Sequence, residues 1–252
     1  MAVALSTLVE EADRYLTSSK IADYCPNGLQ VEGRPQVMRI VSGVTASQAL
    51  LDAAVEANAD LVLVHHGYFW KGENPCITGM KQRRLKTLLK HDISLLAYHL
   101  PLDLHPDVGN NVQLARQLDI TVEGPLDPDN LKIVGLVGSL SEPVTARDFA
   151  RRVQEVMGRE PLLIEGSAMI RRVGWCTGGG QGYIDQAIQA GVDLYLSGEA
   201  SEQTFHSARE NDISFIAAGH HATERYGVQA LGDYLARRFA LEHIFIDCPN
   251  PI

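Results

Sequence analysis

Two segments of the chain repeat one pattern: LLDAAVEANADLVLVHH (residues 50–66) and YIDQAIQAGVDLYLSGE (residues 183–199). Each begins with apolar residues at helical spacing and ends in a short apolar run that is typical of a buried strand. When the two segments are aligned end to end, Asp60 falls on Asp193 and Leu63 falls on Leu196. A second pair, HDISLLAYH (91–99) and NDISFIAAG (211–219), follows in the same order. Chance repetition of a common α/β motif is the alternative, but two ordered matches favour an internal duplication.

Helices and strands alternate along the rest of the chain, which predicts an α/β fold with mixed, largely parallel sheets. The apolar patterns predict helices at 5–16, 47–57, 81–90, 111–118, 145–157, 183–190, 204–210 and 223–239. They predict strands at 37–44, 60–64, 93–98, 132–140, 162–165, 172–176, 193–197, 213–218 and 243–247. A stretch rich in Gly, Pro and Asp at 124–130 is the best boundary, so we expect a first α/β lobe at 1–125 and a second at 126–252.

Composition narrows the class of protein. The chain has 252 residues, 45% of them apolar and 21% charged, which is typical of a globular protein and excludes a disordered, fibrous or disulfide-rich one. Its net charge of −9 argues against stable binding to duplex nucleic acid, which needs a basic face. The four Cys form no CxxC motif, and no signal peptide or membrane-length apolar run is present, so we expect a cytoplasmic protein with no membrane partner.

Polar side chains cluster where the apolar strands end. His65 and His66 follow the strand of the first repeat, and Asp103 follows the next strand. His220 and Glu224 follow the matching strand of the second repeat, with the i, i+4 spacing that brings two side chains to one helix face. Open α/β sheets place their sites beyond the carboxyl ends of strands. These five residues are therefore candidate ligands, although each is also compatible with a satisfied structural role.

Five nitrogen and oxygen donors without a Cys suit Zn²⁺, Mn²⁺, Fe²⁺ or Co²⁺. One catalytic ion usually takes three protein ligands, so two divalent ions per chain fit the number better. Asp103 or Glu224 would bridge the two ions, and the sequence does not rank them. His99 lies four residues before Asp103, with Pro101 between them. It is a candidate catalytic proton carrier, a support for a ligand, or a buried structural histidine.

Three other motifs are compatible with a substrate site but more typical of ordinary structure. Gly178–Gly182 could bind an anion at a helix N-terminus, although a tight turn explains its glycines better. Tyr68–Trp70 could stack on a base or pack in the core. The cations Lys71, Lys81, Arg83 and Arg84 could meet an anionic substrate, although a solvated basic face is the simpler interpretation.

The motifs PNGLQVEG (26–33), GVTAS (43–47), HHGYFWKG (65–72), HLPLD (99–103), CTGGGQ (176–181), SGE (197–199) and GHHATER (219–225) together resemble the YbgI-type dinuclear metal-binding family. Its members are commonly called GTP cyclohydrolase 1 type 2 homologues. The resemblance covers nearly the whole chain and is looser at about 125–170. It implies two related, intertwined lobes, with C-terminal elements returning to the first lobe, and a homohexamer. It also implies that His65, His66, Asp103, His220 and Glu224 bind the two metal ions.

Our leading hypothesis from these observations is a dinuclear metal-dependent hydrolase that acts on a small nucleotide or related heterocycle. In a reaction like that of a GTP cyclohydrolase, water activated by one metal would attack a ring carbon of the purine while the other metal polarises the substrate. A metal-dependent phosphoesterase is the alternative enzyme. A non-catalytic metal-binding scaffold or regulatory protein is the alternative outside catalysis.

Overall fold

A computed structural model describes residues 2–130 and 132–252 of the chain. Met1 and Leu131, which the expected lobes include, lie outside the described residues. The chain forms two compact units. Unit 1 holds the residues up to Gly109 together with Gly227–Pro249, and unit 2 holds Asn110–Tyr226 with Asn250–Ile252. The stretch at 124–130, where we expected the boundary, instead connects two paired strands inside unit 2.

Unit 1 is built on a five-stranded sheet with the order β13-β4-β5-β6-β2. Its strands are β2 (Gly28–Val31), β4 (Arg39–Thr45), β5 (Leu61–His66), β6 (Ser94–Ala97) and β13 (Glu242–Phe245). The pairs β13–β4, β4–β5 and β5–β6 are parallel, whereas β2 runs antiparallel to β6. A two-stranded sheet joins β1 (Val3–Ala4) to β3 (Gln36–Val37). Because β13 comes from the C-terminal segment, the first unit is discontinuous in sequence.

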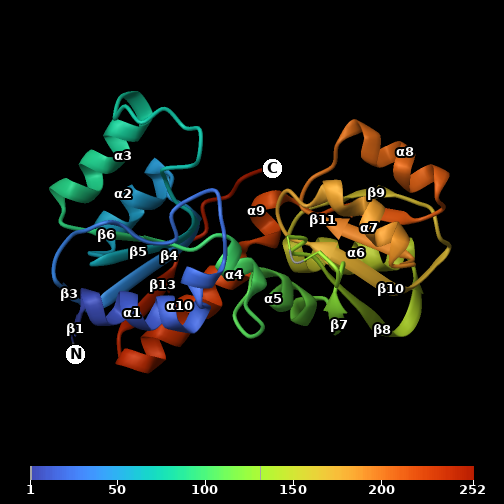
Figure 1. Cartoon of the computed structure of the whole chain (residues 1–252), viewed down its shortest axis with the longest axis horizontal. Helices are drawn as coiled ribbons and strands as arrows, with labels where there is room; N and C mark the ends of the chain where they lie inside the picture. The colour runs from blue at the N-terminus through green and yellow to red at the C-terminus, as the bar shows by residue number, and fades with distance from the viewer. Residues whose placement is uncertain (1, 131) are drawn as a thin grey trace. The chain divides into compact units, whose positions relative to one another are not determined.

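Both faces of this sheet are covered by helices, as Figure 1 shows for the elements coloured blue, teal and red. The helices of unit 1 are α1 (Leu5–Leu16), α2 (Gln48–Glu56), α3 (Gly79–Lys90), α4 (Leu100–Leu104) and most of α10 (Arg225–Phe239), with a short 3₁₀ helix η1 (Ser18–Lys20). Leu61 and Leu63 of β5 belong to the core that α1 and α10 cover. Val62 and Val64 point to the opposite face and pack with α2 and α3. A strand buried on both faces explains the unbroken apolar run LVLV.

Unit 2 is built on a six-stranded sheet with the order β7-β8-β10-β11-β12-β9. Its strands are β7 (Thr121–Pro125), β8 (Leu136–Thr145), β9 (Leu162–Ile164), β10 (Met169–Cys176), β11 (Leu194–Ser197) and β12 (Ser214–Ala217). The β10–β11–β12 centre is parallel, and β7, β8 and β9 add antiparallel strands. The fold is therefore mixed α/β as expected, with parallel pairing dominant in unit 1 and confined to the central strands of unit 2.

The helices of unit 2 are α5 (Asn110–Gln117), α6 (Ala146–Met157), η2 (Gln181–Tyr183), α7 (Ile184–Gln189), α8 (Glu202–Glu210) and α9 (His220–Thr223). The amphipathic helix α6 packs Phe149 and Val153 against the apolar side chains of β10 to β12. Trp175 of β10 is fully buried there, and its Nε1–H donates to the Asn111 carbonyl at 3.0 Å. That bond satisfies the polar atom of the largest buried side chain.

The duplication is visible in strand register. Ile40, Leu61 and Ser94 lie side by side in unit 1, and Val173, Leu194 and Ser214 lie side by side in unit 2. Each parallel trio is followed outward by an antiparallel strand, β2 or β9. The two units therefore share the arrangement helix, strand, helix, strand that the sequence repeat predicts.

Several element boundaries differ from the sequence expectation. The strand expected at 132–140 is β8 at Leu136–Thr145, and the last helix begins at Arg225 because Glu224 leaves helical geometry after α9. The sequence did not predict β2, β7 or α4. Each of these elements is too short to show an apolar period. In addition, all five residues of β7 lack full burial.

Candidate metal centre

The first two candidate ligands are the last two residues of β5, rather than residues that follow the strand. His65 is fully buried, and its Nδ1 lies 2.9 Å from the Tyr98 carbonyl oxygen. A carbonyl only accepts, so Nδ1 carries the proton and donates it. The lone pair then lies on Nε2, which faces Oδ1 of Asp103 at 3.5 Å. This arrangement presents Nε2 in the form that binds a metal.

The side chain of His66 emerges from the other face of the strand end, since neighbouring residues of a strand alternate. Its Nδ1 lies 3.2 Å from the Thr45 hydroxyl on β4, and the tautomer decides which group donates. The ring centroids of His65 and His66 are 4.6 Å apart. The end of the strand thus keeps both rings close despite the alternation.

Asp103 lies in α4, a five-residue helix that begins directly after His99 and carries Pro101 in its first turn. The carboxylate is buried and lies in the first turn of the helix, where the backbone dipole favours a negative charge. The Asp103 N–H donates to the His99 carbonyl at 3.2 Å. The helix therefore fixes the spacing between His99 and Asp103 that the sequence alone left open.

His99 is held by a partner that sequence analysis did not single out. Its Nδ1 donates to both carboxylate oxygens of Asp23, at 3.0 and 3.2 Å. Burial alone would raise the pKa of the Asp23 carboxyl, but hydrogen bonds from His99, Asn27 and the Leu100 N–H hold that pKa far below its usual range. The carboxylate therefore stays charged and keeps the Nδ1–H tautomer of His99.

Three histidines of unit 1 form one compact group. His65, His66 and His99 each offer a ring nitrogen, and these atoms lie within 4.8 Å of one another. A second group on the same unit joins His99 to Asp23 and Cys25. Imidazole nitrogens in this number suit a first-row transition metal. The donor types, and the Nδ1 contacts that orient His65 and His99, fit a metal.

Unit 2 places His220 and Glu224 at the two ends of α9. The helix begins at His220 as the i, i+4 spacing requires, and Glu224 follows its last residue. His220 Nε2 lies 3.2 Å from Oε2 of Glu224, and the carboxylate is almost completely buried. On the other side of the ring, Nδ1 donates to Oε1 of Glu199 at 2.5 Å. One imidazole is thus held between two carboxylates.

The electrostatics of His220 follow from this position. Burial lowers the pKa of its imidazole, but hydrogen bonds and charges from Glu224 and Glu199 outweigh the burial and raise the pKa to about 9. In the chain without metal, the two carboxylates therefore favour the protonated form of the ring. A divalent cation supplies positive charge at the same place and takes the nitrogen lone pair, so metal and proton compete for it.

The glycine loop at 178–182 packs against this pair rather than opening an α-helix. Gly178 has a positive φ of 64°, and its N–H donates to the Thr223 hydroxyl at 2.9 Å. A Cβ at this position would overlap Oε1 of Glu224. Gly180 leads into η2, and α7 begins only at Ile184. The loop is a tight turn whose first glycine makes room for the carboxylate.

Comparison with known proteins identifies the family. The model of the family described as Duf34/NIF3 (NGG1p interacting factor 3) matches residues 3–251. The chain belongs to the DUF34/NIF3 family. Among its NIF3 relatives, the GTP cyclohydrolase 1 type 2 homolog of Pseudomonas aeruginosa is 78% identical over 251 residues, which cover 100% of both chains. The protein of the same name from Haemophilus influenzae is 55% identical and aligns over 94% of both.

Solved structures of this family have the same fold. A structure titled protein ybgI, of unknown function, superposes with a TM-score of 0.95 at 52% identity, covering 99% of this chain and 100% of its own. The TTHA1606 protein of Thermus thermophilus gives a TM-score of 0.91 at 34% identity, with the same coverage. The resemblance to the YbgI-type family is therefore confirmed.

The aromatic run of this NIF3 chain divides between core and site. Tyr68 is buried, and its hydroxyl donates to the Ala46 carbonyl at 2.8 Å. Trp70 instead meets the His99 ring edge-on, with 5.1 Å between centroids. Tyr24 contacts the same histidine at 5.0 Å. Two aromatic rings thus enclose His99, and the core-packing interpretation of the run is confirmed for Tyr68.

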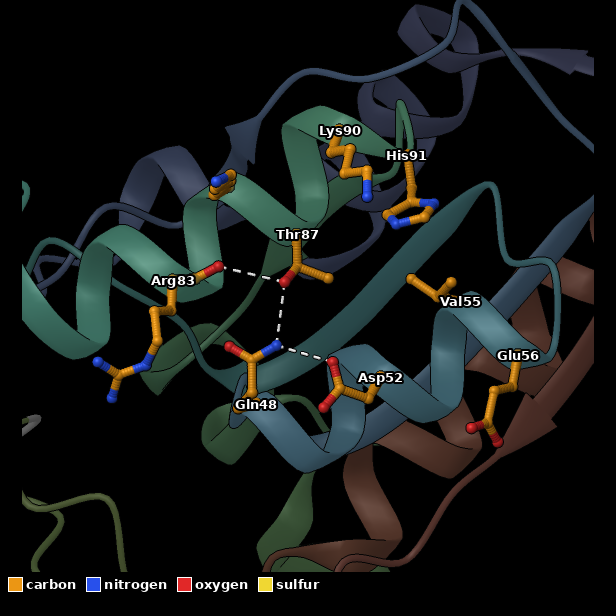
Figure 2. Close-up of a pocket in the computed structure, with 9 residues that line it drawn as sticks. Gln48, Asp52, Val55, Glu56, Arg83, Thr87, Lys90 and His91 are labelled. Atoms are coloured by element: carbon orange, nitrogen blue, oxygen red, sulfur yellow. Dashed lines mark hydrogen bonds between the residues drawn. The ribbon is translucent and has the colours of Figure 1, made fainter.

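The basic residues that follow the histidine pair serve separate contacts. Lys81 pairs with Glu73 at 3.3 Å. Arg83 lines a groove between α2 and α3 that Figure 2 shows, together with Lys90 of α3 and the acidic Asp52 and Glu56 of α2. Opposite charges therefore face each other across this groove, and none of the proposed metal ligands lines it.

Three further points concern the cysteines, membrane-spanning helices and the contact partners of the candidate histidines. All four cysteines are free thiols. Within the described part of the chain, no helix is both long enough and apolar enough to cross a membrane. Asp23, Thr45 and Glu199, which contact the candidate histidines, were missed because a contact partner that is distant in the chain leaves no local pattern. Glu199 alone had a signal, since it occupies the repeat position of His66.

Proposed function

We propose that this NIF3 protein is a metal-dependent hydrolase in which two divalent ions are bound by five residues. The ligands are His65, His66 and Asp103 of unit 1 and His220 and Glu224 of unit 2. One observation carries this proposal: in each unit, the Nε2 atom of a histidine lies beside a buried carboxylate. The distances are 3.5 Å for His65 with Asp103 and 3.2 Å for His220 with Glu224.

When bound, two divalent ions would lower the pKa of a water molecule and polarise the substrate. Among the protein's own residues, His99 is the one that we propose transfers a proton in the reaction. Because Asp23 holds the proton on Nδ1, Nε2 of His99 is the atom that accepts a proton from water and returns it to the substrate. Tyr24 and Trp70 pack against this ring and limit its access to solvent.

The substrate we propose is a small nucleotide or a related heterocycle. Support comes from the relatives, whose name is GTP cyclohydrolase 1 type 2 homolog. Hydrolytic opening of a purine ring at the carbon between two nitrogens releases that carbon as formate. We also infer that the protein acts in the cytoplasm, since four free thiols suit a reducing compartment. The resemblance to the YbgI-type family is the basis for proposing a homohexamer.

Metal analysis tests the proposed centre. We expect close to two transition-metal ions per chain in metal-replete protein, and a lower content in His65→Ala and Glu224→Gln. His206→Ala is the matched control, because His206 and Glu202 form an exposed pair at the same i, i+4 spacing, 3.1 Å apart. Wild-type protein that binds no metal tightly would remove the basis of the proposal.

A nucleotide panel read by mass spectrometry tests the reaction. Incubation of metal-loaded protein with GTP is expected to release formate, and His99→Gln is expected to slow that release by about 10²–10⁴-fold. Release of phosphate or nucleoside would instead assign a phosphoesterase. Absence of turnover across the panel, with both metals bound, would point to a metal-binding scaffold.

A further inference from the structure

Unit 2 contains a surface pocket of about 570 Å³ beside His220. Its lining includes Arg159, Leu162, Glu199, Ala217 and Gly219. None of the five proposed metal ligands lines it, but Gly219 directly precedes one of them in the chain. The volume lies within the range of small-molecule sites.

Arg159 is the unusual member of this lining. Its side chain makes no hydrogen bond or ion pair with any residue in the described ranges 2–130 and 132–252. Nη1 is completely shielded from solvent and has no acceptor among those residues. A guanidinium carries five donors and is always charged, so a buried donor without an acceptor is costly. Such a group in a pocket is ready to receive an acceptor from a ligand.

The backbone places this guanidinium at the start of the His220 segment. Gly219 has a φ of 103°, and a Cβ there would overlap Nη1 of Arg159. A Cβ on Gly198 would likewise meet the backbone of His220. Both glycines therefore allow close packing that side chains would prevent. Arg159 and His220 are thus positioned by the same stretch of backbone.

Two arginines elsewhere in the described residues show the usual case, in which the protein itself supplies the acceptor. Arg172 donates to the Ala190 carbonyl at 2.7 Å, and Arg34 pairs with Asp60 at 2.8 Å. The groove of Figure 2 sets Lys90 and Arg83 opposite Asp52 and Glu56. The cations of that groove, Arg83, Lys86 and Lys90, thus lie beside two carboxylates, whereas Nη1 of Arg159 has no acceptor among the described residues.

We propose that this pocket binds an anionic group of the substrate, most specifically a phosphoryl group, through Arg159. The planar guanidinium matches two phosphate oxygens and gives bidentate hydrogen bonds. Two carboxylates, Glu160 and Glu199, also line the pocket; Glu160 is exposed to solvent, and Glu199 accepts a hydrogen bond from His220 at 2.5 Å. Leu162 and Ala217 offer apolar contact to the rest of the ligand. The link to a reaction rests on the proposed function, whereas phosphoryl binding itself does not.

The test uses inorganic pyrophosphate as probe and the full-length chain kept in chelator, so that no metal contributes to binding. We expect titration calorimetry to show binding by the wild type and at least about tenfold weaker binding by Arg159→Gln. Arg159→Lys keeps the charge without the bidentate geometry and should fall between them. Arg151→Gln removes the same charge from an exposed position of α6 and should change affinity less than twofold.

Two results would overturn the proposal. One is equal affinity of Arg159→Gln and wild type, and the other is no pyrophosphate binding by wild type at millimolar concentration. Equal urea midpoints of the Arg159→Gln variant and wild type show that the variant is folded. Metal content separates this proposal from the previous one. Two bound metals with no effect at Arg159 would reject only the phosphoryl site, and pyrophosphate binding without any metal uptake would reject only the metal centre.

Discussion

The two units share a framework and differ at their strand ends. In unit 1, Oδ2 of Asp60 accepts hydrogen bonds from the N–H groups of Met38 and Arg39 at 2.8 and 3.0 Å. In unit 2, Oδ2 of Asp193 accepts from Arg171 and Arg172 at 2.9 and 2.8 Å. The arginines at equivalent positions, Arg39 and Arg172, each donate to a helix-end carbonyl. Hydrogen bonds at the amino ends of the central strands have therefore been retained in both copies.

The carboxyl ends of the same strands carry different residues. In the alignment that pairs Asp60 with Asp193, His65 and His66 correspond to Gly198 and Glu199, and Thr45 corresponds to Gly178. In the following segment, aligned by HDISLLAYH and NDISFIAAG, Asp103 corresponds to Thr223. Thr223 is a structural residue, since its hydroxyl accepts from the Gly178 N–H. Duplication thus kept the hydrogen bonds that hold the sheet and varied the residues that can bind a ligand.

The largest difference between the copies is expected at the shared aspartate. Asp60 is almost completely buried and also pairs with Arg34, whereas Asp193 is only partly buried. Asp60→Ala should lower the free energy of unfolding by about 3–5 kcal/mol, and Asp193→Ala by about 2 kcal/mol. Urea unfolding measures both, with Asp52→Ala as an exposed control. Equal losses at the two positions would show that burial does not distinguish the copies.

A second comparison uses two glycines with the same backbone conformation. Gly178 and Gly191 have φ values of 64° and 65°, but only Gly178 faces a neighbouring carboxylate. Gly191→Ala should cost about 1–2 kcal/mol of stability, as a left-handed residue does. Gly178→Ala should cost about 2–4 kcal/mol, because a Cβ also displaces Glu224. It should reduce bound metal as well. Thermal unfolding and metal analysis of the same samples check both effects, and unchanged metal content would contradict the packing argument.

A third comparison concerns the groups that orient the histidines. Glu199→Gln removes a carboxylate from Nδ1 of His220, and Thr45→Val removes a neutral hydroxyl from Nδ1 of His66. We expect metal affinity to fall by about 10–100-fold for Glu199→Gln and by about tenfold at most for Thr45→Val. Competition with a chelator of known affinity gives both constants. A greater loss for Thr45→Val would reverse the expected order of the two units.

The smallest effect is expected at a glutamine pair related by the repeat. Gln48 joins α2 to Thr87 of α3 at 3.0 Å, as Figure 2 shows, and Gln181 reaches Ser201 before α8 at 3.3 Å. Each should contribute about 0.5–1 kcal/mol to stability, the usual range for one hydrogen bond. Substitution of either by Ala, followed by urea unfolding, measures this. A cost well above that range at one position alone would show that the two contacts are not equivalent.

Sequence patterns predicted the elements whose structure depends on the spacing of apolar residues within one segment. The run LVLV predicted a strand buried on both faces, and the repeat predicted equivalent strands in both halves. Strands such as β7 lacked an apolar period because they lie at an edge, and α4 escaped because five residues carry no periodicity. The apolar patterns could not predict the division into units, because the pairing of β13 with β4 joins residues far apart in the chain. Only the family resemblance implied that C-terminal elements return to the first lobe.

Prediction of the site residues was limited in the same way, because contacts between distant segments leave no local pattern. Residue types and strand ends pointed to His65 and His220, which do lie beside carboxylates within their own units. Asp23 and Arg159 lie outside every such pattern. The role of Asp23 depends on a loop that folds over His99, and that of Arg159 depends on Gly219, which is distant from it in the chain. Contacts of this kind are set by tertiary packing.

The return of the chain to unit 1 has a consequence for synthesis on the ribosome. Strand β4 cannot acquire its neighbour β13 until residues 242–245 have left the exit tunnel, after every residue of Asn110–Tyr226 has been made. The later-encoded unit is nearly continuous and has its complete sheet before the first unit does. Folding is therefore expected to finish at the N-terminal unit, which inverts the usual order of domain folding during translation. A ribosome stalled before residue 242 would hold His65 and His66 on an incomplete sheet.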